Sequence, residues 1–208
     1  SGIQLLPNNF TLDAYKLLMD YKLIWTGYKN TIIRCVVGTA LGVILTALTA
    51  YPLSKKELPF NGVFTNFIMF TMMFSGGMIP SYLLVKDLHL LNSLWALILP
   101  TLLGAYNIFI MRNFFRSIPV SLEEAARMDG ASWFYIWWKI IIPLAKPVLA
   151  TITLWILVGH WNSWFDATIY ITDPEKTVMQ VVLRRISIEN SAADMNAIMV
   201  RMQKGANA

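Results

Sequence analysis

Charged residues are scarce in this sequence. Only 14% of its 208 residues are charged and 56% are hydrophobic, whereas an average soluble domain has roughly 25% charged residues. The apolar residues gather in blocks that reach the ~20 residues a helix needs to cross a ~30 Å hydrocarbon core. A water-soluble fold is disfavoured by this balance. The composition therefore predicts an all-α, polytopic helical membrane protein.

Several motifs that carry chemistry are also missing. Cys35 is the only cysteine, so the chain holds neither a disulfide framework nor a cysteine metal cluster. No Gly-x-x-x-x-Gly-Lys-Ser/Thr loop is present to bind phosphates, and no His-Glu-x-x-His pair to bind zinc. Asp166 is the only acidic residue in the middle of an expected span, so no pair of acids is available there for catalysis. We therefore expect no catalytic residues, no metal site and no enzyme activity in this chain.

Four apolar stretches are long enough to cross a membrane. We expect one transmembrane domain over residues 1–208, with spans near residues 31–53, 64–86, 91–115 and 148–171. Arg34 lies near the start of the first stretch, where its long side chain is expected to snorkel to the lipid headgroups. The run from Ser75 to Pro80 contains two glycines and a proline. These residues predict a kink or break in the second span.

Basic residues in the connections predict the orientation of the spans, because short loops rich in Lys and Arg stay in the cytoplasm. The first connection holds Lys55 and Lys56, and the second holds only Lys86. The third holds five basic residues: Arg112, Arg116, Arg127, Lys139 and Lys146. We therefore expect the first and third connections in the cytoplasm and both ends of the sequence outside. No aromatic-basic motif accompanies the net charge of +5, so no nucleic-acid partner is expected.

The polar segment over residues 116–147 predicts two short helices. Ser121 followed by Glu124 forms a capping-box pattern, which predicts that a helix of about two turns starts at Ser121. Gly130 supplies the positive φ with which many helices end. A second helix is expected from Ser132 until Pro143, and its run of aromatic side chains favours a place at the membrane surface.

This segment resembles the signature of the permeases of binding-protein-dependent ABC importers. The signature reads Glu-Ala-Ala, three residues, Gly, nine residues, Ile, one residue, Leu-Pro. Its places are occupied here by Glu124, Ala125, Ala126, Gly130, Ile140 and Pro143, and its longer form is matched by Asp129, Ala131 and Pro147. Trp137 and Ile142 replace the usual Phe and Leu by other large apolar side chains. The resemblance extends over most of the chain and is nearest to the maltose-type carbohydrate-uptake branch.

The resemblance implies the type I importer transmembrane-domain fold, also called MetI-like, in which members carry one more span before residue 1 and one after residue 208. It implies a solute permease, for a sugar or oligosaccharide, in the bacterial cytoplasmic membrane. The implied partners are a second permease subunit, a cytoplasmic ATPase dimer that binds ATP and Mg, and an extracytoplasmic solute-binding protein. No cofactor is expected in this chain. The coupling loop spans about 116–147, and its ATPase-coupling residues would be Glu123, Glu124, Ala125, Ala126, Arg127, Asp129, Gly130 and Ala131.

Polar residues in the fourth span allow two interpretations. On a continuous helix Asn162 and Asp166 share a face, and His160 points nearly opposite. With Trp161 and Trp164 they would form a wet passage whose aromatic faces and hydrogen-bonding groups suit a sugar. The alternative is structural hydrogen bonding together with anchoring of the tryptophans at the membrane interface.

Two other functions remain open at this stage. One is a permease of the same type for a solute that is not a sugar. The other is a membrane scaffold subunit without transport activity, which would explain the spans but not the coupling signature.

Overall fold

The computed structural model describes residues 22–188, and every regular element in this range is a helix. The expected all-α class is therefore confirmed. Of the described helices, one is long and apolar enough to cross a membrane alone, and the total rises to as many as four spans if each of three bent helix pairs counts as one. The bounds of the individual spans remain predictions.

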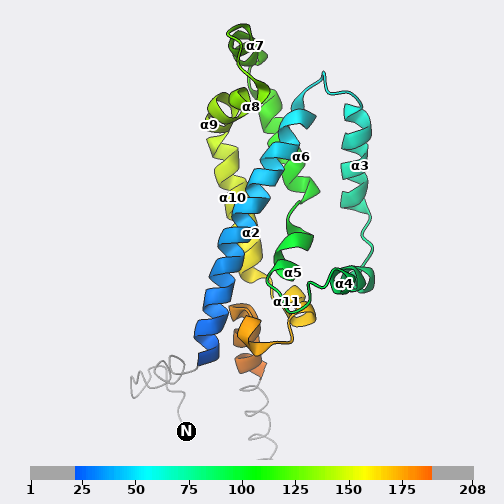
Figure 1. The fold of residues 1–208 in the computed structure, drawn as a ribbon, viewed down its shortest axis with the longest axis vertical. Helices are drawn as coiled ribbons and strands as arrows, with labels where there is room; N and C mark the ends of the chain where they lie inside the picture. Colours follow the sequence, from blue (N-terminus) through cyan, green and yellow to red (C-terminus); the bar gives the residue numbers. More distant parts are fainter. Residues whose placement is uncertain (1–21, 189–208) are drawn as a thin grey trace, which may run out of the picture.

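Helix α2 (Lys22–Ser54) is the central element and runs along most of the described structure (Figure 1). It has 33 residues, which corresponds to about 50 Å at 1.5 Å per residue. The helix starts well before residue 31, where we expected the first span to begin. The helix packs against α6 (Ala105–Ser117) and α10 (Lys146–Asn162).

One glycine of α2 allows the close approach of α10. A methyl group added at Gly38 would lie 2.5 Å from Nε2 of His160. Gly42, four residues later, faces the Leu102 carbonyl oxygen at 3.3 Å and the Ile156 side chain of α10 at 3.4 Å from an added methyl group. Small residues at such a spacing are common where membrane helices pack closely, and here Gly38 leaves the room that the His160 ring occupies.

The remaining long apolar stretches are bent helix pairs. Helices α3 (Asn61–Met73) and α4 (Met78–Asp87) meet at 112° across residues 74–77, where Gly77 has a φ of 87°. The break predicted in this stretch is confirmed. A bend of 51° separates α6 from the turn formed by α5 (Trp95–Ile98) and a 3-10 segment (Leu99–Thr101), which contains Pro100.

The third bent pair leads into α10. Helix α8 (Trp133–Ile136) continues through a π-helical turn (Trp137–Ile141) into α9 (Ile142–Leu144), and this combined helix meets α10 at 81°. The helix that we expected to stop by Pro143 thus ends one residue later. The wider turn ends two residues before Pro143, which has no amide to donate to a regular helix.

The fourth apolar stretch is broken near its end. Helix α10 stops at Asn162, and α11 (Phe165–Tyr170) starts three residues later. The Asp166 carboxylate accepts hydrogen bonds from the Ser163 hydroxyl at 2.7 Å and the Ala167 amide at 2.8 Å. Such local side-chain bonds compete with helix continuation. Asn162 and Asp166 therefore do not share a face of one helix, contrary to the sequence-based expectation.

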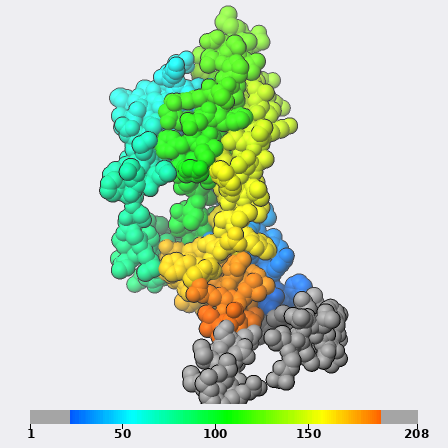
Figure 2. All heavy atoms as spheres, turned by 180° about the vertical axis from the view of Figure 1, so that it is seen from behind, coloured from blue at the N-terminus to red at the C-terminus, as the bar shows by residue number. Residues whose placement is uncertain are grey.

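After α11 the chain forms a 3-10 turn (Pro174–Lys176) and a further helical segment over residues 179–188. Both lie beside the first turns of α2 (Figure 1). The main core lies near the other end, where α2, α6, α8 and α10 enclose Phe115, Ile136 and Ile141. By contrast, α3 buries none of its residues, and Figure 2 shows open space between the α3–α4 segment and the rest of the chain.

Candidate functional site

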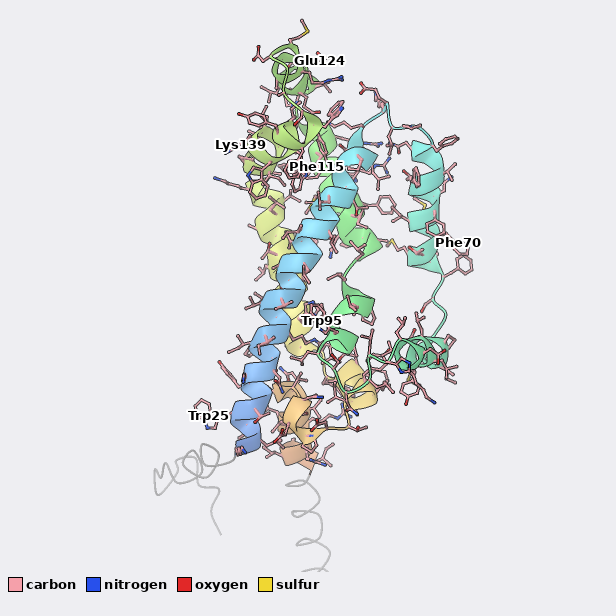
Figure 3. The ribbon with its side chains drawn as sticks, viewed as in Figure 1. Trp25, Phe70, Trp95, Phe115, Glu124 and Lys139 are labelled. Carbon is pink, nitrogen blue, oxygen red and sulfur yellow. The ribbon has the colours of Figure 1, made fainter. Side chains whose placement is uncertain are left out.

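Helix α7 (Val120–Met128) projects from one end of the molecule, and Figure 3 shows Glu124 at this tip. The helix starts at Val120, and no side-chain hydrogen bond caps its first turn. The predicted capping box is therefore wrong, since Ser121 already lies inside the helix. Only Ile118 and Pro119 separate α6 from α7, and Pro119 takes the N-cap position with a φ of −56° and a ψ of 125°. Proline presets this φ, so the chain enters the helix before Ser121.

The end of α7 follows the prediction for Gly130, whose φ is 82°. The Ala131 amide donates to the Ala126 carbonyl at 3.0 Å, and the Gly130 amide donates to the Arg127 carbonyl at 2.9 Å. These two bonds form a Schellman motif. A Cβ added at Gly130 would meet nothing within 4 Å, so backbone conformation alone favours glycine here.

The second short helix begins where the sequence predicts. The Ser132 hydroxyl accepts a hydrogen bond from the Tyr135 amide at 3.3 Å and caps α8. Across the turn, the Arg127 guanidinium lies 4.4 Å from the centroid of the Trp133 ring. This cation–π contact ties the end of α7 to the start of α8.

Helix α7 has two different faces. Glu123 is only 4% exposed, and Ala126 packs against the main core. Glu124, Ala125 and Met128 are exposed, and Met128 reaches 89%. The predicted coupling residues thus divide into an inner group held by this chain and an outer group open to a partner. Their role in ATPase coupling stays a prediction.

The inner face is attached to the end of α2. Glu123 forms an ion pair with Lys55, and its second carboxylate oxygen accepts a hydrogen bond from the Tyr51 hydroxyl at 3.2 Å. The first and third connections therefore meet at one end of the molecule, as the distribution of basic residues led us to expect. The connection over residues 88–94 lies toward the opposite end (Figure 1).

The four residues predicted for a solute pathway make contacts with different elements. Trp161 packs edge to face on Tyr28 of α2 at a centroid distance of 6.0 Å, and the Trp164 ring lies 3.5 Å from the Arg184 guanidinium. Asn162 is exposed, whereas Asp166 is engaged in an ion pair with Arg34. Their participation in solute passage stays a prediction.

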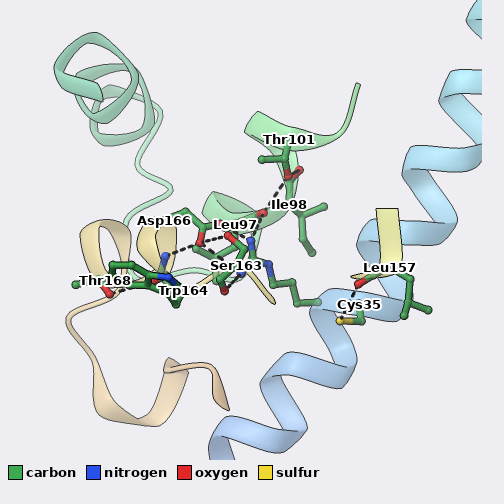
Figure 4. A network of polar contacts seen from close by, with 11 residues as sticks. Cys35, Leu97, Ile98, Thr101, Leu157, Ser163, Trp164, Asp166 and Thr168 are labelled. Atoms are coloured by element: carbon green, nitrogen blue, oxygen red, sulfur yellow. Dashed lines mark hydrogen bonds and ion pairs between the residues drawn. The ribbon is translucent and has the colours of Figure 1, made fainter. Parts of the chain in front are cut away.

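Arg34 does not snorkel as expected. It is 1% exposed, and it contacts Leu97, Ser163 and Asp166, which Figure 4 shows close together at one junction. Besides the Asp166 ion pair, its guanidinium donates to the Ser163 carbonyl at 3.1 Å and the Leu97 carbonyl at 3.4 Å. A buried charge is stable only when paired and hydrogen-bonded, and this junction supplies both.

A small polar cavity of about 250 Å³ lies beside this junction. It is lined by Arg34, Thr101, Asn107, Ile156, Gly159, His160 and Ser163, and none of the four predicted pathway residues lines it. Small-molecule sites usually have roughly 300–1,000 Å³, so this cavity is too small for an oligosaccharide. Polar residues in apolar stretches, such as Asn107 and His160, were the available sequence signal for it.

Residues 22–188 contain no group of three or more His, Cys, Asp or Glu side chains that could hold a metal ion.

Comparison with known proteins gives consistent matches over most of the chain. Residues 38–200 match the family model described as "Binding-protein-dependent transport system inner membrane component". The chain is 44% identical over 182 residues to protein LplC of Bacillus subtilis, covering 88% of this chain and 62% of that protein. It is also 44% identical over 187 residues to the polygalacturonan/rhamnogalacturonan transport system permease protein YtcP of the same organism, covering 90% of this chain and 65% of that protein.

A solved structure matches the fold equally well. It is the crystal structure of a bacterial ABC transporter involved in the import of the acidic polysaccharide alginate. The TM-score is 0.85 at 43% identity, and the match covers 89% of this chain and 66% of that one. The present chain thus spans just under two thirds of the length of these relatives.

Proposed function

The chain belongs to the family of binding-protein-dependent transport system inner membrane components, and we propose that it is the permease subunit of an ATP-binding-cassette importer. In this proposal its helices form part of the translocation pathway for a solute in the bacterial cytoplasmic membrane. ATP hydrolysis takes place on a separate ATPase dimer, which also holds ATP and Mg. The chain itself contributes no catalytic residue.

The observation that carries this proposal is the form of α7. The segment with the Glu-Ala-Ala signature stands out from the helical body as a separate helix (Figure 1). Its inner face is fixed by Glu123, and its outer face presents Glu124 and Met128. A helix that is held on one side and open on the other suits docking of a cytoplasmic ATPase. Closure of the ATPase pair would move the membrane helices as rigid bodies.

The proposed assembly contains a second permease subunit and an extracytoplasmic solute-binding protein. The α3–α4 segment exposes large apolar side chains, including Phe64, Phe67, Phe70 and Ile79. Exposed apolar surface of this extent fits contact with lipid or with another transmembrane subunit.

For the solute, we propose an oligosaccharide. YtcP is named for polygalacturonan and rhamnogalacturonan, and the solved importer is titled for the acidic polysaccharide alginate. Galacturonate and alginate units both carry a carboxylate, so oligomers of uronic acids are the first solutes to test.

The experiment uses the tagged protein purified from its native membrane. We expect an ATPase and a second permease to co-purify, and ATP hydrolysis to rise when the solute-binding protein is added with a uronic-acid oligosaccharide. Neutral oligosaccharides and amino acids serve as comparison solutes. Stimulation only by an amino acid would contradict the sugar assignment. Absence of any co-purifying ATPase would contradict the permease function and favour a scaffold subunit.

A further inference from the structure

We propose that the contact of Glu123 with Lys55 and Tyr51 is the joint that transmits movement of α7 to α2. The three residues are positioning residues for coupling, distinct from the outer face of α7 that meets the ATPase. The inference rests on the proposed importer function.

The joint is compact and largely removed from solvent. One oxygen of the Glu123 carboxylate pairs with the Lys55 ammonium, and the other accepts from the Tyr51 hydroxyl at 3.2 Å. The ammonium also lies 4.7 Å from the centroid of the Tyr51 ring. Glu123 and Tyr51 are both buried. Each partner thus contacts the other two, so the contact resists sliding as well as separation.

The α2 side of the joint is held firmly. The last carbonyls of a helix have no partner within it, and here side chains from outside α2 satisfy them. Arg112 Nε donates to the Leu53 carbonyl at 2.9 Å, and Arg116 Nε donates to the Ser54 carbonyl at 3.3 Å. Asn61 Nδ2 donates to the Leu53 carbonyl at 3.1 Å and to the Lys55 carbonyl at 2.6 Å. These hydrogen bonds hold Lys55 and the last residues of α2 together, so a displacement of Lys55 also moves the end of α2.

Helix α7 is attached to the rest of this chain at a few further points, including Ala126 at the main core and Arg127 on the Trp133 ring. Its covalent neighbours are the two-residue link to α6 at Ile118 and Pro119 and the turn at Gly130. A cleft of about 440 Å³ separates much of α7 from the first connection, and both Glu123 and Lys55 line it. The ion pair bridges this cleft between segments 68 positions apart in the chain. Together with the Tyr51 hydrogen bond, it connects α7 directly to the end of α2, although the two segments are far apart in the sequence.

Helix α2 is suited to carry the movement further. It is unbroken over 33 residues and packs along α6 and α10. Toward its other end, Arg34 pairs with Asp166 of α11. A shift imposed at Lys55 thus reaches the junction at the opposite end of the chain through one continuous helix, whereas the other long apolar stretches contain bends of 51° or more.

The test compares Lys55→Ala, Glu123→Ala and the charge-swapped double variant Lys55→Glu/Glu123→Lys in the assembled transporter. We expect each single variant to retain the ATPase in the purified complex but to lose at least tenfold in stimulation of hydrolysis by the loaded binding protein. The double variant should regain a large part of this stimulation. Lys56→Ala, a neighbouring exposed lysine, is the matched control and should behave as the wild type.

Three results would overturn the proposal: wild-type stimulation in both single variants, loss of the ATPase from them, or no recovery in the double variant. Failure of the importer function itself is recognised separately, because the wild-type complex would then show no stimulation by any loaded binding protein.

Discussion

Arg34 on α2 and Asp166 on α11 form an ion pair across 132 positions of the sequence. The pair joins the long central helix to the short helix that follows the break in the fourth apolar stretch. Arg34 is 1% exposed and Asp166 is 19% exposed. The charge of Arg34 therefore depends more strongly on pairing than the charge of Asp166 does.

This asymmetry predicts unequal effects of removing each partner. Asp166→Ala leaves a buried guanidinium without its ion-pair partner and should lower the free energy of unfolding by roughly 3–5 kcal/mol. Arg34→Met should lower the free energy of unfolding by a smaller amount, because the Asp166 carboxylate still accepts hydrogen bonds from the Ser163 hydroxyl and the Ala167 amide. Thermal unfolding of the purified protein in detergent measures both. The double variant Arg34→Met/Asp166→Ala should be more stable than Asp166→Ala alone.

The control for this pair is Lys176→Ala, which removes a 3.8 Å ion pair between exposed side chains. Exposed pairs contribute about 0–1 kcal/mol, so this variant should unfold close to the wild-type temperature. Equal losses in Lys176→Ala and Asp166→Ala would contradict the structural role of the buried pair.

Close packing of α2 on α10 predicts opposite outcomes for two glycine substitutions. Gly38→Ala places a methyl group 2.5 Å from Nε2 of the buried His160, and overpacking of this kind costs about 1–3 kcal/mol. Gly159→Ala meets nothing within 4 Å, and replacing glycine within a helix stabilises it by up to ~1 kcal/mol. The unfolding temperature should therefore fall for Gly38→Ala and stay the same or rise for Gly159→Ala. The reverse order would refute the packing described here.

The turn after α7 predicts a graded series at Gly130. Its φ of 82° is unfavourable for side chains, by roughly 1–2 kcal/mol in the left-handed region. Asparagine tolerates that region better than a β-branched residue. We expect Gly130→Asn to keep most ATPase association and Gly130→Val to lose more of it, as measured by co-purification. Gly62→Ala, at an open position with ordinary φ, is the control; equal retention in all three would show that the turn does not position α7.

The sequence was sufficient for some local features because neighbouring residues determine them. The break before Met78 follows from Gly76 and Gly77, and the end of α7 follows from Gly130. The start of α7 was misplaced because Pro119 outweighs the Ser121 pattern. Local signals thus predicted the break before Met78 and the turn at Gly130, but competition between adjacent signals determined the start of α7.

Contacts between distant segments were not predictable in the same way. Arg34 carries the usual signal of a snorkelling residue, and only the fold brings Asp166 and the Leu97 carbonyl to it. Likewise, nothing near Glu123 in the sequence points to Lys55. The Gly38-x-x-x-Gly42 spacing was a readable signal for helix packing, although it does not say which helix packs there.

Site-specific cross-linking from the outer face of α7 tests the central claim most directly. The chain has one cysteine, Cys35, so a Cys35→Ala background allows a single photoactivatable label at Met128→Cys, which is 89% exposed in the wild type. The comparison site is Leu88→Cys, also exposed, at the end of α4 and away from α7. We predict a cross-link from Met128→Cys to the co-purified ATPase and none from Leu88→Cys. An ATPase that co-purifies yet cross-links only to Leu88→Cys would contradict coupling through α7.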